Sequence, residues 1–354
     1  MAQDGITLVT GAGGFIGGRI VEMLHLAGAR RVRAGIHRWS SCARIGRFPV
    51  DIAPLDLTNG ASTAGALDGV TEIVHCARGS REVTVQGTRN LLDAAAAAGV
   101  RRCVHLSTTE VYGAGDGTFT EQSECPRTGR EYGDMKLDAE HVCREFSERG
   151  LGLTILRPPI VYGPFSTWWT VDLARKLISG RWGTMGIHAE GACNLLYVDD
   201  LVRAIRIALD HPRAAGETFN INGPETISWN GYFVKLASAL GLPPLAEHGS
   251  SRAALRAALW EPVRKLGGFV KRNCMTTVKS AAARWRLVDT MMRATERRLK
   301  TAPSRAEMAL FGRNARFPAD KAREVLGFVP AISTDEGTRL SAAWLRHEGF
   351  LLGR

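Results

Sequence analysis

The feature that most constrains the fold of this 354-residue chain is a glycine-rich turn between an apolar strand and a helix. Ile6–Thr10 is a short apolar run typical of a buried parallel strand, and apolar residues at helical spacing begin at Ile20. Strand, glycine turn and helix in this order are the context in which a turn binds the pyrophosphate of a dinucleotide. A turn of this kind that binds no ligand is the alternative interpretation. The residues predicted to contact the cofactor are Gly11, Gly13, Gly14, Phe15, Ile16 and Gly17.

Three glycines of the turn are each expected for a different physical reason. Gly11 permits the tight turn, Gly14 lets the backbone approach a pyrophosphate, and Gly17 lets the helix pack closely on the strand. The first N–H groups of the helix have no partner within the helix, so an anion is favoured there.

Strands and helices alternate through the first half of the chain. Apolar runs predict strands over Val32–Arg38, near Asp51–Leu57, over Glu72–Ala77 and over Cys103–Ser107, with a helix over Val83–Ala98. This alternation predicts an α/β fold built on a doubly wound parallel sheet.

The end of the second predicted strand bears on the choice of dinucleotide. A carboxylate there suits the ribose 2′-hydroxyl of NAD, whereas arginine suits the 2′-phosphate of NADP. No acid stands between Arg30 and Val50, and His37, Arg38 and Arg44 occupy the region. We therefore expect NADP in preference to NAD. The alternative is that these basic side chains are only solvated.

Tyr132 and Lys136 are four residues apart, so on a helix both project from one face. A nearby cation favours the phenolate and lowers the pKa of a tyrosine. A phenol tuned in this way can exchange a proton with a carbinol or carbonyl oxygen near neutral pH. The pair alone arises often by chance, and its weight comes from the glycine turn upstream.

Taken together, these motifs resemble the extended short-chain dehydrogenase/reductase family, which includes nucleotide-sugar epimerases and dehydratases. The resemblance covers most of the chain. It implies a Rossmann-type dinucleotide-binding domain over residues 1–165, to which 192–222 return, and a smaller, mostly helical substrate-binding domain over 166–191 and 223–354. The motifs that carry it are the Thr10–Gly17 turn, Asp56-Leu57, Ser107–Gly113, Tyr132–Lys136, Arg157–Pro164, Tyr197–Leu201 and Phe219–Gly223.

The resemblance also assigns roles to individual residues. It makes Tyr132 the catalytic acid/base, Lys136 its tuning cation and a partner of the nicotinamide ribose, and Thr108 the hydroxyl that polarises the substrate oxygen. An ordinary strand-end threonine is the alternative for Thr108, and a helix cap is the alternative for Asp56. The implied cofactor-binding residues beyond the glycine turn are His37, Arg38, Asp56, Leu57, Ala77, Tyr132, Lys136 and Pro159.

Several positions depart from the nucleotide-sugar members of the family. Ile160 stands where those members often carry asparagine, and the stretch Ala192–Tyr197 lacks the arginine that helps to hold a diphosphate. Both changes indicate a pocket less oriented to phosphate, although other arginines can compensate. Thr109 stands where dehydratases carry an acid, and Glu110 is compatible with either a structural or a proton-abstracting role.

Arg78 is a further departure, because a small residue is usual at its position. Two interpretations of Arg78 stay open, contact with a cofactor phosphate and exposure to solvent.

Composition narrows the class of protein. The seven cysteines are scattered without metal-ligand or Cys-x-x-Cys spacing, which suits reduced thiols in a cytosol. No signal peptide precedes the first strand, and no apolar run is long enough to span a bilayer. We therefore expect a cytoplasmic protein with no metal, and the resemblance implies a homodimer.

Positive charge is concentrated late in the chain. Residues 250–319 hold 16 Lys plus Arg against 4 Asp plus Glu, and the net charge of the whole chain is +11. Apolar residues from Leu255 to Val270 recur at helical spacing among these basic groups. Such a helix can cover the substrate cleft, and it can also make weak peripheral contact with an anionic membrane. Nucleic acid is not expected, because no recognition motif accompanies the charge.

The sequence therefore predicts an NAD(P)-dependent oxidoreductase of the extended short-chain type, which transfers hydride reversibly at a secondary alcohol or ketone of a small-molecule substrate. The first alternative is a nucleotide-sugar epimerase or dehydratase that recycles its cofactor within one turnover. The second is a cofactor-sensing protein without turnover, against which the intact Tyr132–Lys136 pair and Thr108 argue.

Overall fold

A computed structural model describes residues 5–28, 30–247, 262 and 301–350 of the chain. The basic helix predicted between Leu255 and Val270, and most of the segment 250–319, lie outside the described residues. In the described part, no helix has both the length and the hydropathy needed to cross a membrane.

The chain divides into two compact units. The first contains Met1–Ser166, Asn194–Glu225 and Ala315–Thr334, and the second contains Thr167–Cys193, Thr226–Asn314 and Asp335–Arg354. Ala315–Thr334 therefore belong to the first unit, whereas the sequence interpretation placed them in the substrate-binding domain.

The first unit is built on a seven-stranded parallel sheet with the strand order β10-β7-β5-β4-β1-β2-β3. The predicted α/β fold with a doubly wound parallel sheet is confirmed. The chain order reverses between β1 and β4, and in such sheets ligands bind at the carboxyl ends of the strands beside this point. The strands are β1 (Ile6–Thr10), β2 (Arg31–Ile36), β3 (Asp51–Pro54), β4 (Val70–His75), β5 (Arg102–Leu106), β7 (Gly152–Arg157) and β10 (Thr218–Asn220).

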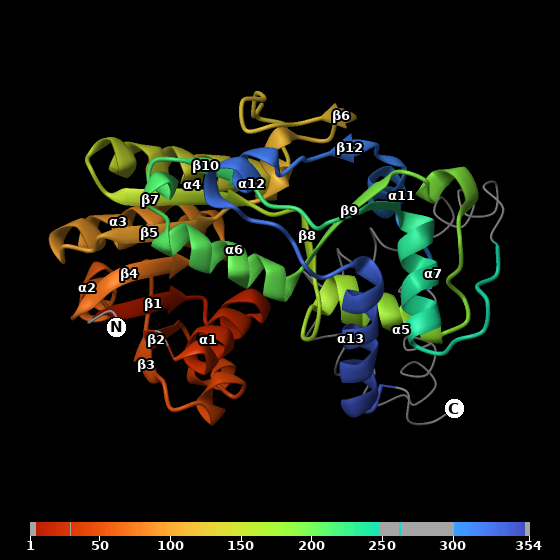
Figure 1. The fold of residues 1–354 in the computed structure, drawn as a ribbon, viewed down its shortest axis with the longest axis horizontal. Coiled ribbons are helices and arrows are strands. Elements are labelled where there is room, and N and C mark those ends of the chain that lie inside the picture. The colour runs from red at the N-terminus through yellow and green to blue at the C-terminus, as the bar shows by residue number, and fades with distance from the viewer. Residues whose placement is uncertain (1–4, 29, 248–261, 263–300, 351–354) are drawn as a thin grey trace. The chain divides into compact units, whose positions relative to one another are not determined.

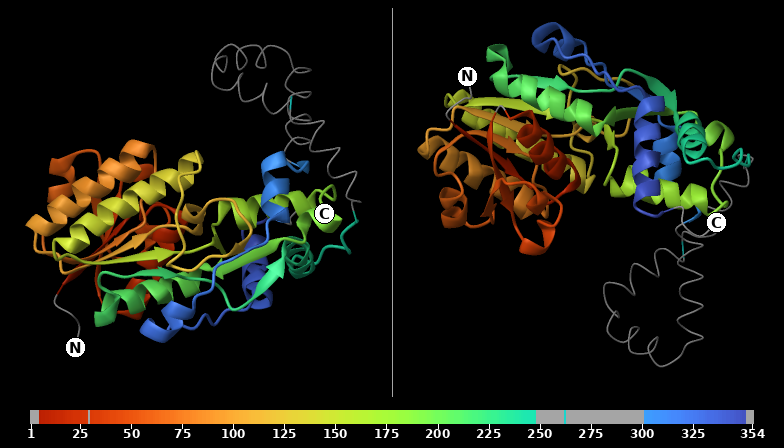
Figure 2. Two further views of the ribbon diagram at one scale, coloured as in Figure 1. Left: turned by 90° about the horizontal axis from the view of Figure 1, so that it is seen from above. Right: turned by 60° about the horizontal axis from the view of Figure 1, so that its bottom comes forward.

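Helices cover both faces of this sheet (Figures 1 and 2). Helices α3 and α4 pack together on one face, and α1 and α6 pack together on the other. Outside this sheet, β12 (Ala315–Arg316) pairs in parallel with β6 (Gly117–Thr118), and β8 (Ile160–Tyr162) pairs in parallel with β9 (Ala192–Tyr197). The helices are α1 (Phe15–Ala27), α2 (Gly60–Gly65), α3 (Gly87–Ala97), α4 (Glu131–Glu148), α6 (Val198–Asp210) and α12 (Asp320–Leu326).

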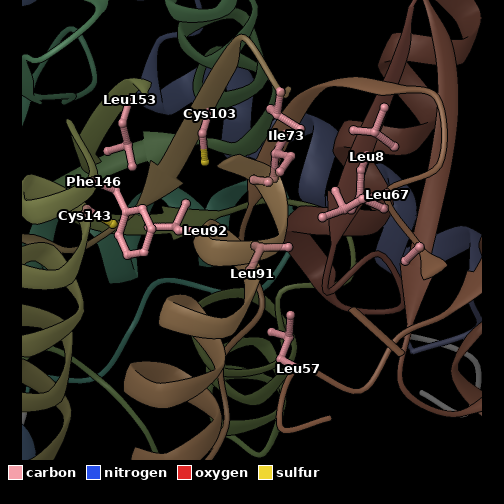
Figure 3. Close-up of a cluster of buried hydrophobic side chains, with 14 of the residues drawn as sticks. Leu8, Leu57, Leu67, Ile73, Leu91, Leu92, Cys103, Cys143, Phe146 and Leu153 are labelled. Atoms are coloured by element: carbon pink, nitrogen blue, oxygen red, sulfur yellow. The ribbon is translucent and has the colours of Figure 1, made fainter. Parts of the chain in front are cut away.

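One apolar core lies between the sheet and the face formed by α3 and α4 (Figure 3). Leu8, Ile73 and Cys103 contribute from three neighbouring strands, and Leu91 and Phe146 contribute from α3 and α4. Full burial of a leucine or phenylalanine side chain stabilises a fold by about 1.5–3 kcal/mol. The strands read as almost continuous apolar runs because both faces of a parallel sheet are covered in this way.

The helix predicted over Val83–Ala98 has a different form in the structure. A π-helical turn, Glu82–Gln86, precedes α3, and only then does regular α-helix begin. Thr88 Oγ1 donates to the carbonyl of Thr84 at 2.6 Å within this transition. Hydrophobic periodicity does not distinguish the two helix types, so the sequence did not predict the change.

The second unit has an aromatic core. The rings of Trp229 and Phe311 lie 4.5 Å apart, and Phe233 meets Phe311 edge-on at 5.4 Å. Asn230 beside them accepts from the backbone N–H of Met185 at 2.9 Å. Its elements are α5 (Leu173–Ile178), β11 (Thr226–Ser228), α7 (Trp229–Ala239), α11 (Arg305–Gly312) and α13 (Thr334–His347).

Two histidines lie side by side in the middle of the sheet, and they differ in their polar contacts. His75 on β4 and His105 on β5 have ring centroids 5.1 Å apart, and each is 1% exposed. His75 has partners on both nitrogens, whereas both ring nitrogens of His105 are buried without a hydrogen-bond partner. Burial, with a smaller effect of Lys136, lowers the pKa of His75 to about 3 and the pKa of His105 well below its usual value.

We expect His105→Leu to raise the free energy of unfolding by about 1 kcal/mol at pH 7.5, because it removes two unsatisfied buried polar atoms. The gain should grow as the pH falls below about 6.5. There the unfolded chain binds a proton at residue 105 that the folded chain does not, so the native histidine costs stability that leucine does not. Urea unfolding at pH 7.5 and 5.5 measures both effects. His141→Leu on the exposed side of α4 is the control. A loss of stability in His105→Leu at both pH values would contradict this account.

Candidate active site

The turn between β1 and α1 brings backbone atoms too close together for any side chain. A Cβ on Gly17 would lie 2.3 Å from the carbonyl oxygen of Gly11, and a Cβ on Gly11 would lie 2.8 Å from Cα of Ala77. Gly11 also has a φ of +66°, in the left-handed region that glycine adopts without strain. The glycines of this turn are therefore required by the packing of β1, α1 and the loop after β4.

The amino end of α1 is open to an anion. Its N-cap is Gly14, which has no side chain with which to cap the helix, and the first helical residues are Phe15, Ile16 and Gly17. Their N–H groups and the positive end of the helix dipole suit a phosphate group. Gly13 faces Ser41, and a Cβ there would lie 2.5 Å from Ser41 Oγ.

Three basic residues after the second strand were predicted to favour NADP, and one of them, Arg44, makes contacts within the protein that occupy its guanidinium group. Its guanidinium donates to the carbonyl of Phe15 at 3.2 Å and to Glu22 at 3.0 Å, and it stacks on Phe165 at 3.9 Å. Burial lowers the pKa of Arg44 despite its ion pair with Glu22. Arg44 is therefore a structural support for the glycine turn.

His37 and Arg38 follow the carboxyl end of β2, and both are exposed. Asp56 lies nearby, since His37 acts electrostatically on its carboxylate. Hydrogen bonds from the side chain and the backbone N–H of Thr58 lower the pKa of Asp56. Asn59, not Asp56, caps the following helix α2, so the helix-cap alternative for Asp56 does not apply. Leu57 next to it is buried against α3.

A buried chain of hydrogen bonds fixes the loop that carries Ala77. The N–H of Ala77 donates to Thr10 Oγ1 at 3.2 Å, and Thr10 Oγ1 lies 2.8 Å from His75 Nδ1. His75 Nε2 lies 2.9 Å from Thr88 Oγ1, whose proton is already donated to Thr84. Nε2 of His75 must therefore donate and Nδ1 must accept, which assigns one neutral tautomer. The chain ties the ends of β1 and β4 to α3.

The end of β5 separates the two hydroxyls that the sequence placed there. Ser107 Oγ donates to the buried carboxylate of Glu140 at 2.5 Å. Arg157 holds the same carboxylate through two hydrogen bonds, at 2.9 and 2.6 Å. Although burial raises the pKa of Glu140, the hydrogen bonds and charge of Arg157 bring it below its usual value. Ser107 is thus engaged in a structural network, and Thr108 is the hydroxyl that remains beside Tyr132.

Tyr132 and Thr108 come together as the sequence suggested. Tyr132 is half-buried on the first turn of α4, and its phenol has a hydrogen-bonding interaction with the Thr108 side chain. Thr108 Oγ1 also accepts from the N–H of Glu110 at 3.2 Å. Gly133 permits this approach, because a Cβ there would lie 2.8 Å from the carbonyl oxygen of Glu110.

The ionisation of Tyr132 differs from the sequence expectation. The pKa of Tyr132 is raised, because burial outweighs the lowering effects of Arg78 and Thr108. The cation beside the phenol is Arg78, whose guanidinium carbon lies 5.6 Å from the centre of the tyrosine ring. Lys136 instead donates to the carbonyl of Leu106 at 2.6 Å and is 3% exposed. Burial lowers the pKa of Lys136 to about 8.

The positions that depart from nucleotide-sugar enzymes are either apolar or already bonded to other groups of the protein. Ile160 is on β8 opposite Leu195 of β9, and β9 is buried from Cys193 to Tyr197. Thr109 is buried, and its N–H donates to the carbonyl of Pro158 at 3.1 Å. Pro159 follows, half-buried, at the end of β7. Glu110 forms an ion pair with Arg130 at 3.1 Å.

The residues gathered at the carboxyl edge of the sheet fit a dinucleotide. The glycine turn would hold the pyrophosphate, and the end of β2 would hold the adenosine. The loop with Ala77 would line the part of the cofactor that extends toward Thr108 and Tyr132. Fold and site together define a Rossmann-type dinucleotide-dependent enzyme. Among the described residues, no group of three or more His, Cys, Asp or Glu side chains is arranged to hold a metal ion.

Comparison with known proteins agrees with this class. Residues 7–222 match the model of the NAD dependent epimerase/dehydratase family, and the chain belongs to this family. It is 33% identical over 232 residues to sterol demethylase protein B of Methylococcus capsulatus, which covers 61% of this chain and 69% of that protein. It is 28% identical over 257 residues to UDP-glucose 4-epimerase of Vibrio cholerae, which covers 67% and 76% of the two chains.

Solved structures show the same fold. UDP-glucuronic acid 4-epimerase from Bacillus cereus in complex with NAD aligns with a TM-score of 0.71 and 18% sequence identity, over 97% of this chain and 96% of that one. The predicted membership of the extended short-chain dehydrogenase/reductase family, and an NAD-dependent enzyme of the epimerase, dehydratase or reductase kind, are confirmed.

Sequence reasoning missed three parts of the site. It left Arg78 unassigned, although the unusual residue at this position was a signal. It counted Arg44 among the basic residues that favour NADP, because a local pattern does not show partners that are distant in sequence. It gave no role to Thr10, His75 and Thr88, because these residues come together only when β1, β4 and α3 pack side by side.

We expect Gly17→Ala to weaken NAD(P)H binding at least tenfold, about 1.4 kcal/mol, because the new methyl group forces α1 away from Gly11. Fluorescence titration with NADH and NADPH measures the dissociation constants. Gly65→Ala is the matched control, since a Cβ at the end of α2 meets no atom within 4 Å. An unchanged dissociation constant in Gly17→Ala would contradict the required close contact.

Proposed function

We propose that this enzyme catalyses reversible hydride transfer at a secondary alcohol or ketone, with a substrate other than a nucleotide sugar. The observation that carries the proposal is the meeting of the Tyr132 phenol and the Thr108 hydroxyl at the carboxyl edge of the sheet. Two hydroxyl groups that converge there can hold one substrate oxygen between them.

The proton chemistry belongs to Tyr132. When bound, a nicotinamide supplies the hydride chemistry, and the protein supplies orientation and proton transfer. In the reducing direction Tyr132 gives its proton to the carbonyl oxygen of the substrate, and in the oxidising direction it takes the proton of the alcohol. Thr108 donates a hydrogen bond to the same oxygen and stabilises the negative charge that develops on it. The raised pKa of Tyr132 favours the protonated phenol, which is the form that reduction requires.

The surroundings of the site support a substrate that carries no diphosphate. Ile160 replaces a polar anchor, and the buried strand β9 offers no arginine. The Methylococcus relative is named for sterol demethylation, and another relative, 25% identical, is a 3-beta-hydroxysteroid dehydrogenase. A hydroxyl or ketone on an apolar ring system is therefore the first substrate class to test.

Cofactor stoichiometry distinguishes this proposal from its alternative. We expect one NAD(P)H to be consumed for each ketone reduced, followed at 340 nm with a panel of steroid and other ring ketones. An epimerase or dehydratase would convert UDP-glucose, or a related nucleotide sugar, with no net change in cofactor. Turnover of a nucleotide sugar without such a change would overturn the proposal.

Tyr132→Phe is the matched variant for that assay. We expect it to lower kcat at least a hundredfold, as removal of a positioned general acid does. The dissociation constant for NAD(P)H should change less than threefold, because the substitution removes only one oxygen. Full activity in this variant would exclude Tyr132 as the acid/base.

We also propose that the enzyme prefers NADP to NAD. His37 and Arg38 are exposed after β2, no carboxylate stands between them and Val50, and Arg38 can approach a 2′-phosphate. Several of the similar solved structures contain NAD, and the proposed preference would distinguish this chain from those proteins.

We expect Arg38→Gln to weaken NADPH binding about tenfold, the effect of one charge-assisted hydrogen bond, and to leave NADH binding unchanged. Arg31→Gln, at the opposite end of β2, removes the same charge and is the control. Tighter binding of NADH than NADPH by the native protein would contradict the preference. The expected homodimer, the cytoplasmic location and membrane contact through 250–319 stay predictions.

A further inference from the structure

Arg78 occupies a place beside the reacting group that the proposed chemistry has not used. It lies in the loop between β4 and the π-helical turn, and its guanidinium carbon is 5.6 Å from the centre of the Tyr132 ring. Its charge and a side-chain hydrogen bond both act on the phenol. Neither of the two roles left open by the sequence, contact with a cofactor phosphate or exposure to solvent, accounts for this contact.

An ion-pair cluster fixes the Arg78 loop to the helix that carries Tyr132. Arg81, three residues beyond Arg78, pairs with Asp138 of α4, and Arg127 pairs with the same carboxylate. Asp138 is 8% exposed, whereas the side chains of Arg81 and Arg127 are more than half exposed. The N–H of Gly79 donates to Thr84 Oγ1 at 3.2 Å and closes the loop on itself. Arg78 is thus held beside Tyr132 by the fold.

The charges that face the phenol come from three directions. Arg78 approaches from the β4 loop, and Glu110 approaches from the end of β5, where Arg130 pairs with its carboxylate. Lys136, on the same helix as Tyr132, directs its ammonium group to the Leu106 carbonyl. Arg78 is therefore the cation placed to respond to charge on the tyrosine oxygen.

We propose that Arg78 is a further residue of the catalytic site, whose guanidinium contacts the Tyr132 phenol and stabilises negative charge on its oxygen. In the reducing direction the O–H bond of Tyr132 breaks, the substrate oxygen gains the proton, and the electron pair stays on the phenol oxygen beside Arg78. In the oxidising direction the proton returns from the alcohol to that oxygen. This role rests on the proposed function of Tyr132.

A titration without substrate tests the contact directly. The chain has five tyrosines, and four of them, Tyr112, Tyr162, Tyr197 and Tyr232, are at most 3% exposed. Tyr132 should therefore ionise first, and its absorbance change near 295 nm is obtained by subtracting the titration of Tyr132→Phe. Circular dichroism defines the pH range in which the protein stays folded.

We expect Arg78→Gln to raise the ionisation midpoint of Tyr132 by at least one pH unit, a tenfold change, because a cation favours the phenolate. Arg78→Lys should restore part of the shift. Arg101→Gln removes an equal charge from the exposed turn before β5 and should leave the midpoint unchanged. Equal midpoints in the native protein and Arg78→Gln would overturn the proposal.

Measurements of activity then distinguish the proposed role of Arg78 from the proposed acid/base role of Tyr132. In Arg78→Gln the pH profile of kcat/KM should shift in the same direction as the titration, with a loss of at least tenfold at pH 7. A rise in KM with neither shift would make Arg78 a substrate-binding residue and overturn the proposal. Normal turnover by Tyr132→Phe, with the titration shift still present, would overturn the proposed function and leave the contact between Arg78 and Tyr132 established.

Discussion

The close approach of Gly17 to Gly11 is the contact on which the first unit depends. A carbonyl oxygen of the turn lies where a Cβ of the helix would stand, so α1 packs directly against the end of β1. The same turn brings Gly11 against Ala77, and Ala77 is held through Thr10 and His75 to α3. Because Gly11 and Gly17 have no side chains, β1, β4, α1 and α3 can approach one another at the edge of the sheet where the cofactor would bind.

Burial, together with the polar partners that each buried group finds, decides the ionisation of the groups at this edge. Two charged residues, Lys136 and Glu140, and two neutral histidines are buried at or near the carboxyl ends of β4 and β5. Glu140 keeps its charge because Arg157 and Ser107 donate hydrogen bonds to it, whereas neither ring nitrogen of His105 has a hydrogen-bond partner. Tyr132 is intermediate between Glu140 and His105, because burial raises its pKa while the neighbouring Arg78 partly opposes the rise. The fold therefore leaves the phenol responsive to one neighbouring cation.

Much of this arrangement could be predicted from local patterns. The glycine turn, the apolar runs of the strands and the Tyr132–Lys136 spacing are each encoded within a few residues, and the sheet confirmed the fold that they implied. The prediction that Lys136 lowers the pKa of Tyr132 was wrong, because spacing along a helix does not show how deeply a phenol is buried. Arg44 was counted among the residues that favour NADP for a similar reason, since its partners Glu22 and Phe165 are distant in sequence.

The sequence by itself determined the class of fold, the family and the residues from which a hydride-transfer site can be built. These follow from backbone sterics and hydrophobic periodicity, which act over short stretches of chain. Only the tertiary structure decided that Ser107 belongs to the Glu140 network, that Thr108 is left beside Tyr132, and that Arg78 is the cation against the phenol. Burial and electrostatic contacts depend on which distant segments pack together, and no local pattern carries that information.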